Sequence, residues 1–180
     1  LLLVAFLWRR IFIAVDSGEA AVLFRRFGGG TELEQIYGEG FHIIGPWNTM
    51  TVYEVRVQEK TDVVQALSSN GLTIMVTVSM RYFPEFNNLA VLHQKVGPNY
   101  LQRIVIPEVI AAVREIIGKY RPEELYTLKT SDISAAVLAA ASRELGDKFI
   151  RFYDLLVTKI MLPPLVVTAI ENKLTQEQAA

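Results

Sequence analysis

Residues 67–83 read LSSNGLTIMVTVSMRYF, and this stretch carries the clearest structural signal in the chain. Apolar residues occupy every even position from Leu72 to Tyr82, and polar residues occupy the odd positions between them except at Met75. A period of two is typical of a strand with one buried face. We therefore predict a long strand here, with Val76 and Val78 in the core.

The ends of this strand are also marked in the sequence. Asn70 and Gly71 tolerate positive φ, and residues 62–67 before them are extended in character, so the pair is predicted to form a β-hairpin. Pro84 is expected to end the strand, because proline cannot donate to a strand ladder. A long half-buried strand needs further strands beside it and an apolar layer against its buried face.

Composition narrows the function classes. The chain has 180 residues, 51% of them hydrophobic, which is ample for a packed core. Its 18 basic and 19 acidic residues form no basic stripe, so nucleic acid is not expected as a partner. The absence of cysteine excludes disulfides and thiol catalysis within these residues.

The first eight residues are apolar and are followed by Arg9 and Arg10. We expect them to be the end of a longer membrane helix, since eight residues rise only about 12 Å against a bilayer core of about 30 Å. The alternatives are a secretory apolar region or a buried first strand. Trp47, beside Pro46, fits either the core or a surface anchor. The predicted membrane contacts are Leu1, Leu2, Leu3, Val4, Phe6, Leu7, Trp8 and Trp47.

Strands are predicted over residues 11–15 and 20–27, and the second is followed by three glycines, Gly28 to Gly30. A phosphate-binding loop is rejected here, because Glu32 and Glu34 place carboxylates where an anion would sit. We predict a plain turn. Residues 37–47 hold glycines and a proline among large apolar side chains, which is typical of a shaped loop with a short extended segment.

No catalytic, cofactor or metal site is predicted. His42 and His93 are the only histidines, they lie far apart in sequence, and no acidic cluster accompanies either. Satisfied structural histidines are the better interpretation. Glu123 and Glu124 are adjacent, so they point apart on a helix and do not form an acid/base pair. An enzyme is therefore not expected from these residues.

The second half of the chain alternates between helical and extended patterns. Apolar residues recur at helical spacing over residues 99–120, with a kink or break expected at Pro107, and again at Ile133, Val137, Ala141 and Leu145. Helix caps are predicted at Asn87 or Asn88 and at 130–132, a stop at Gly146, and strand-like residues over 149–161. A final helix begins at residue 165. Its oligomer contacts are predicted at Val167, Ile170 and Leu174.

Several phrases, in this order, resemble one family. The apolar start, residues 15–22 (VDSGEAAV), 38–42 (GEGFH), 106–115 (IPEVIAAVRE) and 119–126 (KYRPEELY) are similar to the SPFH or band 7 superfamily of stomatin, prohibitin, flotillin and HflK/HflC. The last two phrases resemble its prohibitin-like branch most. The resemblance covers residues 11–180.

The resemblance implies an α+β fold with four parts. They are the end of a transmembrane anchor (1–10), a β-rich SPFH1 subdomain (11–83), an αβ SPFH2 subdomain (84–163) and the start of a long C-terminal coiled-coil helix (164–180). It also implies a non-enzymatic, single-pass scaffold in a bacterial plasma membrane or mitochondrial inner membrane. Its copies, or close paralogues, would form a ring or cage that organises a membrane microdomain.

Expected partners are membrane lipid, further copies of the chain and a membrane-bound AAA protease. Unpaired strand edges are natural lateral contacts between such copies. Two alternatives stay open. One is a membrane-tethered hydrolase or protease component with its catalytic part elsewhere, and the other is a monomeric lipid- or peptide-binding module.

Overall fold

The computed structural model describes residues 8, 10–146 and 149–178. The predicted membrane contacts Leu1 to Leu7 lie outside the described residues. Strands and helices are both present, which confirms the mixed α and β class. Contacts divide the chain into two compact units, unit 1 (1–58, 82–105 and 147–151) and unit 2 (59–81, 106–146 and 152–180). The units alternate along the chain, and the consecutive subdomains expected from the sequence stay a prediction.

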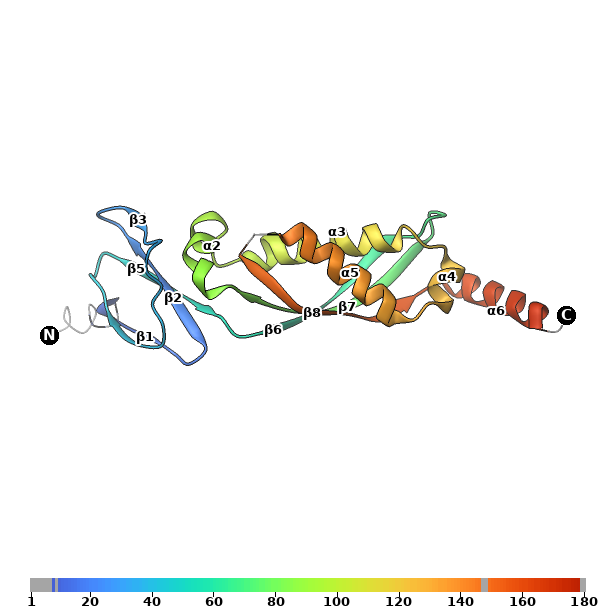
Figure 1. Ribbon diagram of the computed structural model, residues 1–180, viewed down its shortest axis with the longest axis horizontal. Coiled ribbons are helices and arrows are strands. Elements are labelled where there is room, and N and C mark those ends of the chain that lie inside the picture. The colour runs from blue at the N-terminus through green and yellow to red at the C-terminus, as the bar shows by residue number, and fades with distance from the viewer. Residues whose placement is uncertain (1–7, 9, 147–148, 179–180) are drawn as a thin grey trace. The chain divides into compact units, whose positions relative to one another are not determined.

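Unit 1 is built from short antiparallel strands (Figure 1). Its elements are β1 (Phe12–Val15), β2 (Glu19–Arg25), β3 (Gly30–Thr31), β4 (Gly40–Ile43), β5 (Thr49–Glu54), η1 (Phe86–Asn88), α2 (Leu89–Lys95) and the π-helical turn η2 (Leu101–Val105). β1 pairs with β4, and β2 lies between β3 and β5. β1 and β2 confirm the strands predicted over 11–15 and 20–27. The core includes Val15, Ala20, Ala21, Val22, Leu23, Tyr53, Leu89, Leu92 and Tyr100.

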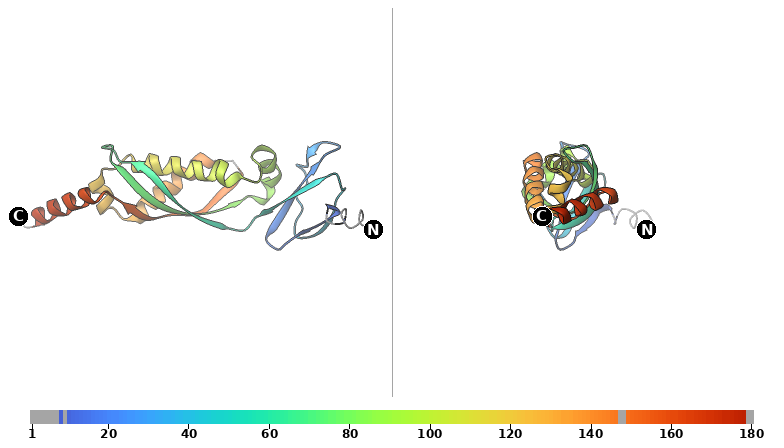
Figure 2. Two further views of the ribbon diagram at one scale, coloured as in Figure 1. Left: turned by 180° about the vertical axis from the view of Figure 1, so that it is seen from behind. Right: turned by 90° about the vertical axis from the view of Figure 1, so that its right-hand side faces the viewer.

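Unit 2 contains most of a three-stranded sheet in the order β6-β7-β8. Its strands and helices are β6 (Gln58–Leu67), β7 (Thr73–Pro84), α3 (Ile106–Ile117), α4 (Pro122–Thr127), α5 (Thr130–Leu145), β8 (Ile150–Met161) and α6 (Pro164–Gln178). Figure 1 shows α3 and α5 side by side over one face of this sheet, and Figure 2 shows α6 extending beyond the end of the strands.

The central strand confirms the pattern that predicted it. Its even positions from Ile74 to Tyr82 are all buried, including Val76 and Val78. The hairpin before it turns at Gly71, whose φ is +82°, whereas Asn70 does not adopt positive φ. Ser79 was expected on the open face but is buried, and its hydroxyl donates to Glu59 Oε1 at 2.8 Å.

The helices follow the predicted apolar spacing, and the predicted cap position is found for α2 but not for α5. Ile133, Val137, Ala141 and Leu145 are buried on α5, which ends at Gly146 as expected. The break near Pro107 is also present, since the π-helical turn η2 ends at Val105 and α3 begins at Ile106, the residue before Pro107.

The predicted cap position is right for α2 and wrong for α5. Asn88 is the N-cap residue of α2, although its side chain makes no capping bond and donates to Glu85 Oε2 instead. The N-cap residue of α5 is Lys129, one position before the predicted group, and it makes no side-chain capping bond either. Among the described residues, no helix combines the length and apolar character that a membrane crossing requires.

Candidate functional site

The paired strands β1 and β4 expose an apolar face in unit 1. Their register places Phe12 opposite Ile43 and Ala14 opposite Phe41. Successive side chains of a strand point to opposite faces, so these four residues share one face. Phe41 is 82% exposed and Ile43 is 73% exposed. We call these four residues the β1–β4 apolar face.

The opposite face of the same strands turns inward. Val15 is buried, and His42 is half-buried with its Nε2 2.7 Å from the carbonyl oxygen of Gly38. The ring of Tyr37 meets His42 edge-on at 5.3 Å between centroids. This inner face anchors the pair of strands, and Phe41 and Ile43 on the outer face remain largely exposed.

Trp8 extends the β1–β4 apolar face toward the N-terminus. Its ring lies 4.2 Å from the ring of Phe12, centroid to centroid, and the residue remains 59% exposed. An amphipathic indole beside an exposed apolar strand pair is typical of a membrane-interface position. Trp8 is the described member of the N-terminal set predicted to contact membrane.

Trp47, the other predicted membrane contact, lies in a second exposed group. It is 52% exposed and its ring centroid lies 6.4 Å from that of Phe27, which is 74% exposed. The neighbouring Arg26 donates its backbone N–H to Asn48 Oδ1 at 3.3 Å, which ties the β2–β3 turn to the Trp47 loop. The sequence left Trp47 between core and surface, and it is at the surface.

Sequence reasoning missed Phe27, Phe41 and Ile43. Phe41 and Ile43 are two positions apart, and this alternation normally predicts burial. The neighbouring Gly38, Gly40 and Gly45 indicate a short shaped segment, but they do not reveal which face of it other parts of the chain cover. Exposed large apolar side chains in one region mark interaction surfaces more often than isolated ones do.

A hydrogen-bond network fixes the turn between β1 and β2. Glu39 Oε1 accepts from the backbone N–H of Gly18 at 2.8 Å and from the Ser17 hydroxyl at 3.2 Å. Arg56 holds Glu54 through two contacts, at 2.6 and 3.1 Å, and lowers the pKa of that carboxyl. A Cβ at Gly18 would lie 2.3 Å from Arg56 Nε, so only glycine fits this turn without displacing the arginine.

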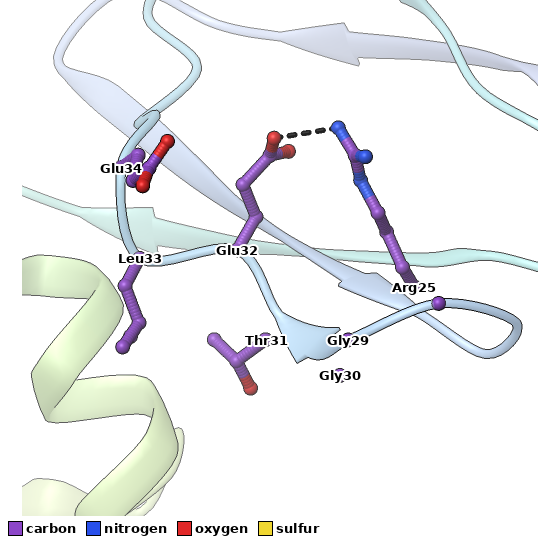
Figure 3. A pocket seen from close by; sticks show the side chains of 8 residues that line it. Arg25, Gly29, Gly30, Thr31, Glu32, Leu33 and Glu34 are labelled. Atoms are coloured by element: carbon purple, nitrogen blue, oxygen red, sulfur yellow. Dashed lines mark hydrogen bonds and ion pairs between the residues drawn. The ribbon is translucent and has the colours of Figure 1, made fainter.

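The three-glycine segment forms the predicted plain turn. Gly28, Gly29 and Gly30 all have positive φ between β2 and β3, and residues 32–36 are not helical. The turn borders a pocket of about 360 Å³. Figure 3 shows Arg25 and Glu32 pointing toward one another across it, with their ion pair at 2.6 Å. Since the arginine is paired with that carboxylate, the pocket has no cradle for an anion.

Both histidines have partners that explain them structurally. His93 Nδ1 lies 2.6 Å from the Tyr53 hydroxyl, and burial lowers the pKa of His93. Burial and then the neighbouring Tyr100 raise the pKa of Tyr53 to about 12, so its hydroxyl stays protonated and donates. Among the described residues, no three His, Cys, Asp or Glu side chains are grouped to hold a metal ion.

The predicted oligomer contacts lie on α6. Val167 is half-buried, whereas Ile170 is only 5% exposed and therefore packs within its own chain. The Tyr126 hydroxyl donates to Glu171 Oε1 at 3.2 Å, which links α4 to α6. The side chain of Leu174 lies outside the described part of the chain. Contact with another copy through these positions stays a prediction.

Comparison with known proteins identifies the family of this chain. The SPFH domain / Band 7 family model matches residues 13–180. Prohibitin-4, mitochondrial, of Arabidopsis thaliana is 26% identical over 167 residues, which cover 92% of this chain and 59% of that protein. Prohibitin-1 of Saccharomyces cerevisiae is 25% identical over 167 residues, which cover 92% of this chain and 57% of that protein.

Prohibitin-2 of Xenopus tropicalis is 22% identical over 178 residues, which cover 98% of this chain and 58% of that protein. The chain thus spans between 57% and 59% of the length of these three relatives. A family model that matches almost every residue, together with relatives that share one name, leaves little room for another assignment. The chain belongs to the SPFH domain / Band 7 family and to its prohibitin-like branch.

Proposed function

We propose that this chain is the membrane-proximal part of a non-enzymatic scaffold that assembles into a ring or cage at a membrane. The observation that carries the proposal is the β1–β4 apolar face, exposed next to Trp8 at the N-terminal end of unit 1. Family membership supports a membrane scaffold in general terms. The ring, its membrane and its clients are our proposal.

Burial of the β1–β4 apolar face in lipid would provide the free energy of membrane binding. Moving a large apolar side chain out of water contributes about 1.5–3 kcal/mol when burial is complete. Phe41 and Ile43, exposed by 82% and 73%, are the side chains with most to gain. Aromatic rings and arginines favour the headgroup region, so Trp8 and Arg10 suit the boundary between acyl chains and water. Unit 1 would then rest on the bilayer beside the proposed anchor, residues 1–10.

Assembly would follow from fixing every copy at the same height. Once anchors hold the copies in one plane, side-by-side contacts repeat with a constant rotation and close a ring. Val167 and Leu174 would begin a coiled-coil wall between neighbouring copies, with Ile170 fixing α6 to its own domain. The enclosed patch of bilayer would form a microdomain that holds or restricts membrane proteins, such as an AAA protease.

The polar residues support a structural role. His42 and His93 are engaged by Gly38 and Tyr53, and the Arg25–Glu32 and Arg56–Glu54 pairs tie turns together. We place the protein in a bacterial plasma membrane or mitochondrial inner membrane, where its partners are lipid and further copies or close paralogues. Nucleic acid is not proposed as a partner.

Tryptophan fluorescence tests membrane contact residue by residue. In the full-length protein, every other tryptophan is replaced by Phe and a single tryptophan is introduced by Phe41→Trp. Lipids brominated on their acyl chains should quench this residue in vesicles. Tyr153→Trp in unit 2 is the matched control, because Tyr153 is exposed on β8 and should not be quenched. Equal quenching at both positions, or none at position 41, would contradict the proposed orientation.

Mass in detergent tests the assembly. The full-length protein should sediment as a large particle of many copies. A monomer would contradict the scaffold and support a lipid- or peptide-binding module instead. A hydrolytic activity that survives purification would contradict the non-enzymatic role.

A further inference from the structure

The outer strands of the unit 2 sheet determine whether another copy of the chain can add a strand to it. β6 and β8 are the two edges of the order β6-β7-β8. An edge strand presents unpaired backbone donors and acceptors, which invite another chain to add a strand. In this protein the chain's own side chains and loops engage several of those groups on both edges.

On β6, two backbone groups are engaged by side chains. The Val63 N–H donates to Asp62 Oδ1 at 2.8 Å, and the carbonyl oxygen of Gln65 accepts from Arg114 Nε at 3.2 Å. Arg114 comes from α3 and lines, with Gln65, an open pocket of about 420 Å³. The guanidinium therefore lies where the backbone of an added strand would have to pass.

The end of β6 is closed by the chain after α3. The Ser69 N–H, just beyond the strand, donates to the carbonyl oxygen of Tyr120 at 2.9 Å. Gly118 lies so close that a Cβ there would sit 3.7 Å from the carbonyl oxygen of Leu67. The space next to this end of the edge is already occupied by backbone.

β8 has a similar arrangement on the other edge of the sheet. The Leu155 N–H donates to Asp154 Oδ1 at 2.8 Å, as Val63 does to Asp62. The Val157 N–H donates to the Ser134 hydroxyl oxygen at 2.8 Å, and this buried hydroxyl donates in turn to the Thr130 carbonyl oxygen at 2.7 Å. α5 thus supplies a cap for β8 as α3 does for β6.

We propose that β6 and β8 are closed to strand addition, so that copies of this chain do not join by extending the unit 2 sheet from one to the next. Arg114, Ser134 and the two aspartates are the residues that close the edges. The inference rests on the proposed assembly and narrows it. Unpaired strand edges were expected as lateral contacts, and for these two strands the contacts between copies are made by side chains instead.

A proline on the edge gives the first test. Val63→Pro in the full-length protein removes the N–H that donates to Asp62 Oδ1, one of the backbone groups by which the proposal closes this edge. Val63→Ala is the control for loss of the side chain, and circular dichroism checks the fold. The particle should sediment unchanged in both variants. A folded Val63→Pro protein that is monomeric, while Val63→Ala assembles, would overturn the proposal.

Opening the edges gives the second test, which is independent of ring formation. The variant Asp62→Ala/Arg114→Ala/Asp154→Ala should gain concentration-dependent association with an infrared band of intermolecular β-sheet. The matched control Glu123→Ala/Lys129→Ala/Asp132→Ala changes net charge equally at exposed positions in or next to α4 and α5. The control should behave as the parent does.

The two tests separate this inference from the proposed function. If the parent is a monomer, the scaffold proposal fails, yet the opened variant should still gain β-sheet association that the parent lacks. If the opened variant shows no more association than the charge-matched control, the capping residues do not protect the edges and the inference is wrong.

Discussion

Val78→Asp is the sharpest test of the fold of unit 2. Val78 is fully buried at the centre of β7, beneath the helices of unit 2, and its neighbour Thr77 is half-buried on the other face. The two substitutions introduce the same carboxylate one residue apart. Because side chains alternate along a strand, only one of the two carboxylates enters the core.

The magnitude follows from the burial of each side chain. Removing Val78 forfeits about 1.5–3 kcal/mol of apolar burial. An uncompensated buried charge costs a further 3–5 kcal/mol, roughly, so the total is about 5–8 kcal/mol. Whole domains have unfolding free energies of about 5–15 kcal/mol, and Val78→Asp should therefore leave little or no folded protein. Thr77→Asp should cost about 1 kcal/mol or less, because its side chain keeps access to water.

Urea and thermal denaturation of the two variants and the parent measure the difference. Val78→Ala is the control, since it removes volume without adding charge and should fall between the two. Equal loss of stability for Thr77→Asp and Val78→Asp would refute the assignment of the faces. A Val78→Asp protein as stable as the parent would refute the burial itself.

Three further substitutions test individual contacts. Gly18→Ala should lower the unfolding free energy by about 1 kcal/mol or more in a urea melt, because Gly18 has a φ of +81°. His93 is held neutral by burial, so its folded pKa lies below the unfolded value of about 6.5 and stability should fall as pH drops below that value. His93→Asn, whose side-chain oxygen can still accept from Tyr53, should flatten this dependence in melts across pH. Ser134→Ala should cost about 1–3 kcal/mol, because it leaves the Val157 N–H without its buried acceptor.

The glycine and serine substitutions each have a matched control. Gly38→Ala should be milder than Gly18→Ala, because Gly38 does not have positive φ and a Cβ there meets nothing within 4 Å. Ser131→Ala, exposed on the same helix as Ser134, should leave the melt unchanged, and an equal loss would contradict the capping role. If the stability of His93→Asn falls at low pH as much as that of the parent, groups other than His93 cause the fall. Arg151 lowers the pKa of Glu85 and Lys119 lowers that of Glu115, so both carboxyls titrate at lower pH than His93.

Periodicity predicted the parts of the fold where one face is buried. The alternation from Ile74 to Tyr82 and the spacing of Ile133, Val137, Ala141 and Leu145 both correspond to core residues. These patterns predict the structure because the free energy of burying apolar area, summed over a helix or strand, outweighs the secondary-structure propensities of single residues. The plain turn at Gly28 to Gly30 was predictable for a different reason, because the carboxylates that follow it disfavour a bound anion.

Features that depend on distant partners could not be predicted. Ser79 donates to Glu59, twenty residues earlier in the chain, and no local pattern reveals that contact. The β1–β4 apolar face was missed because exposure of Phe41 and Ile43 depends on which chain segments cover them. The same limit applies to Ile170, whose burial within the chain is invisible to a heptad pattern.

An electron micrograph of the full-length protein in a lipid membrane tests the central claim most directly. The account predicts closed rings or cages of many copies, with unit 1 in contact with the bilayer through the β1–β4 apolar face and with α6 in the wall between neighbouring copies. Isolated single copies spread over the membrane, or rings whose unit 1 is held away from the bilayer, would contradict it.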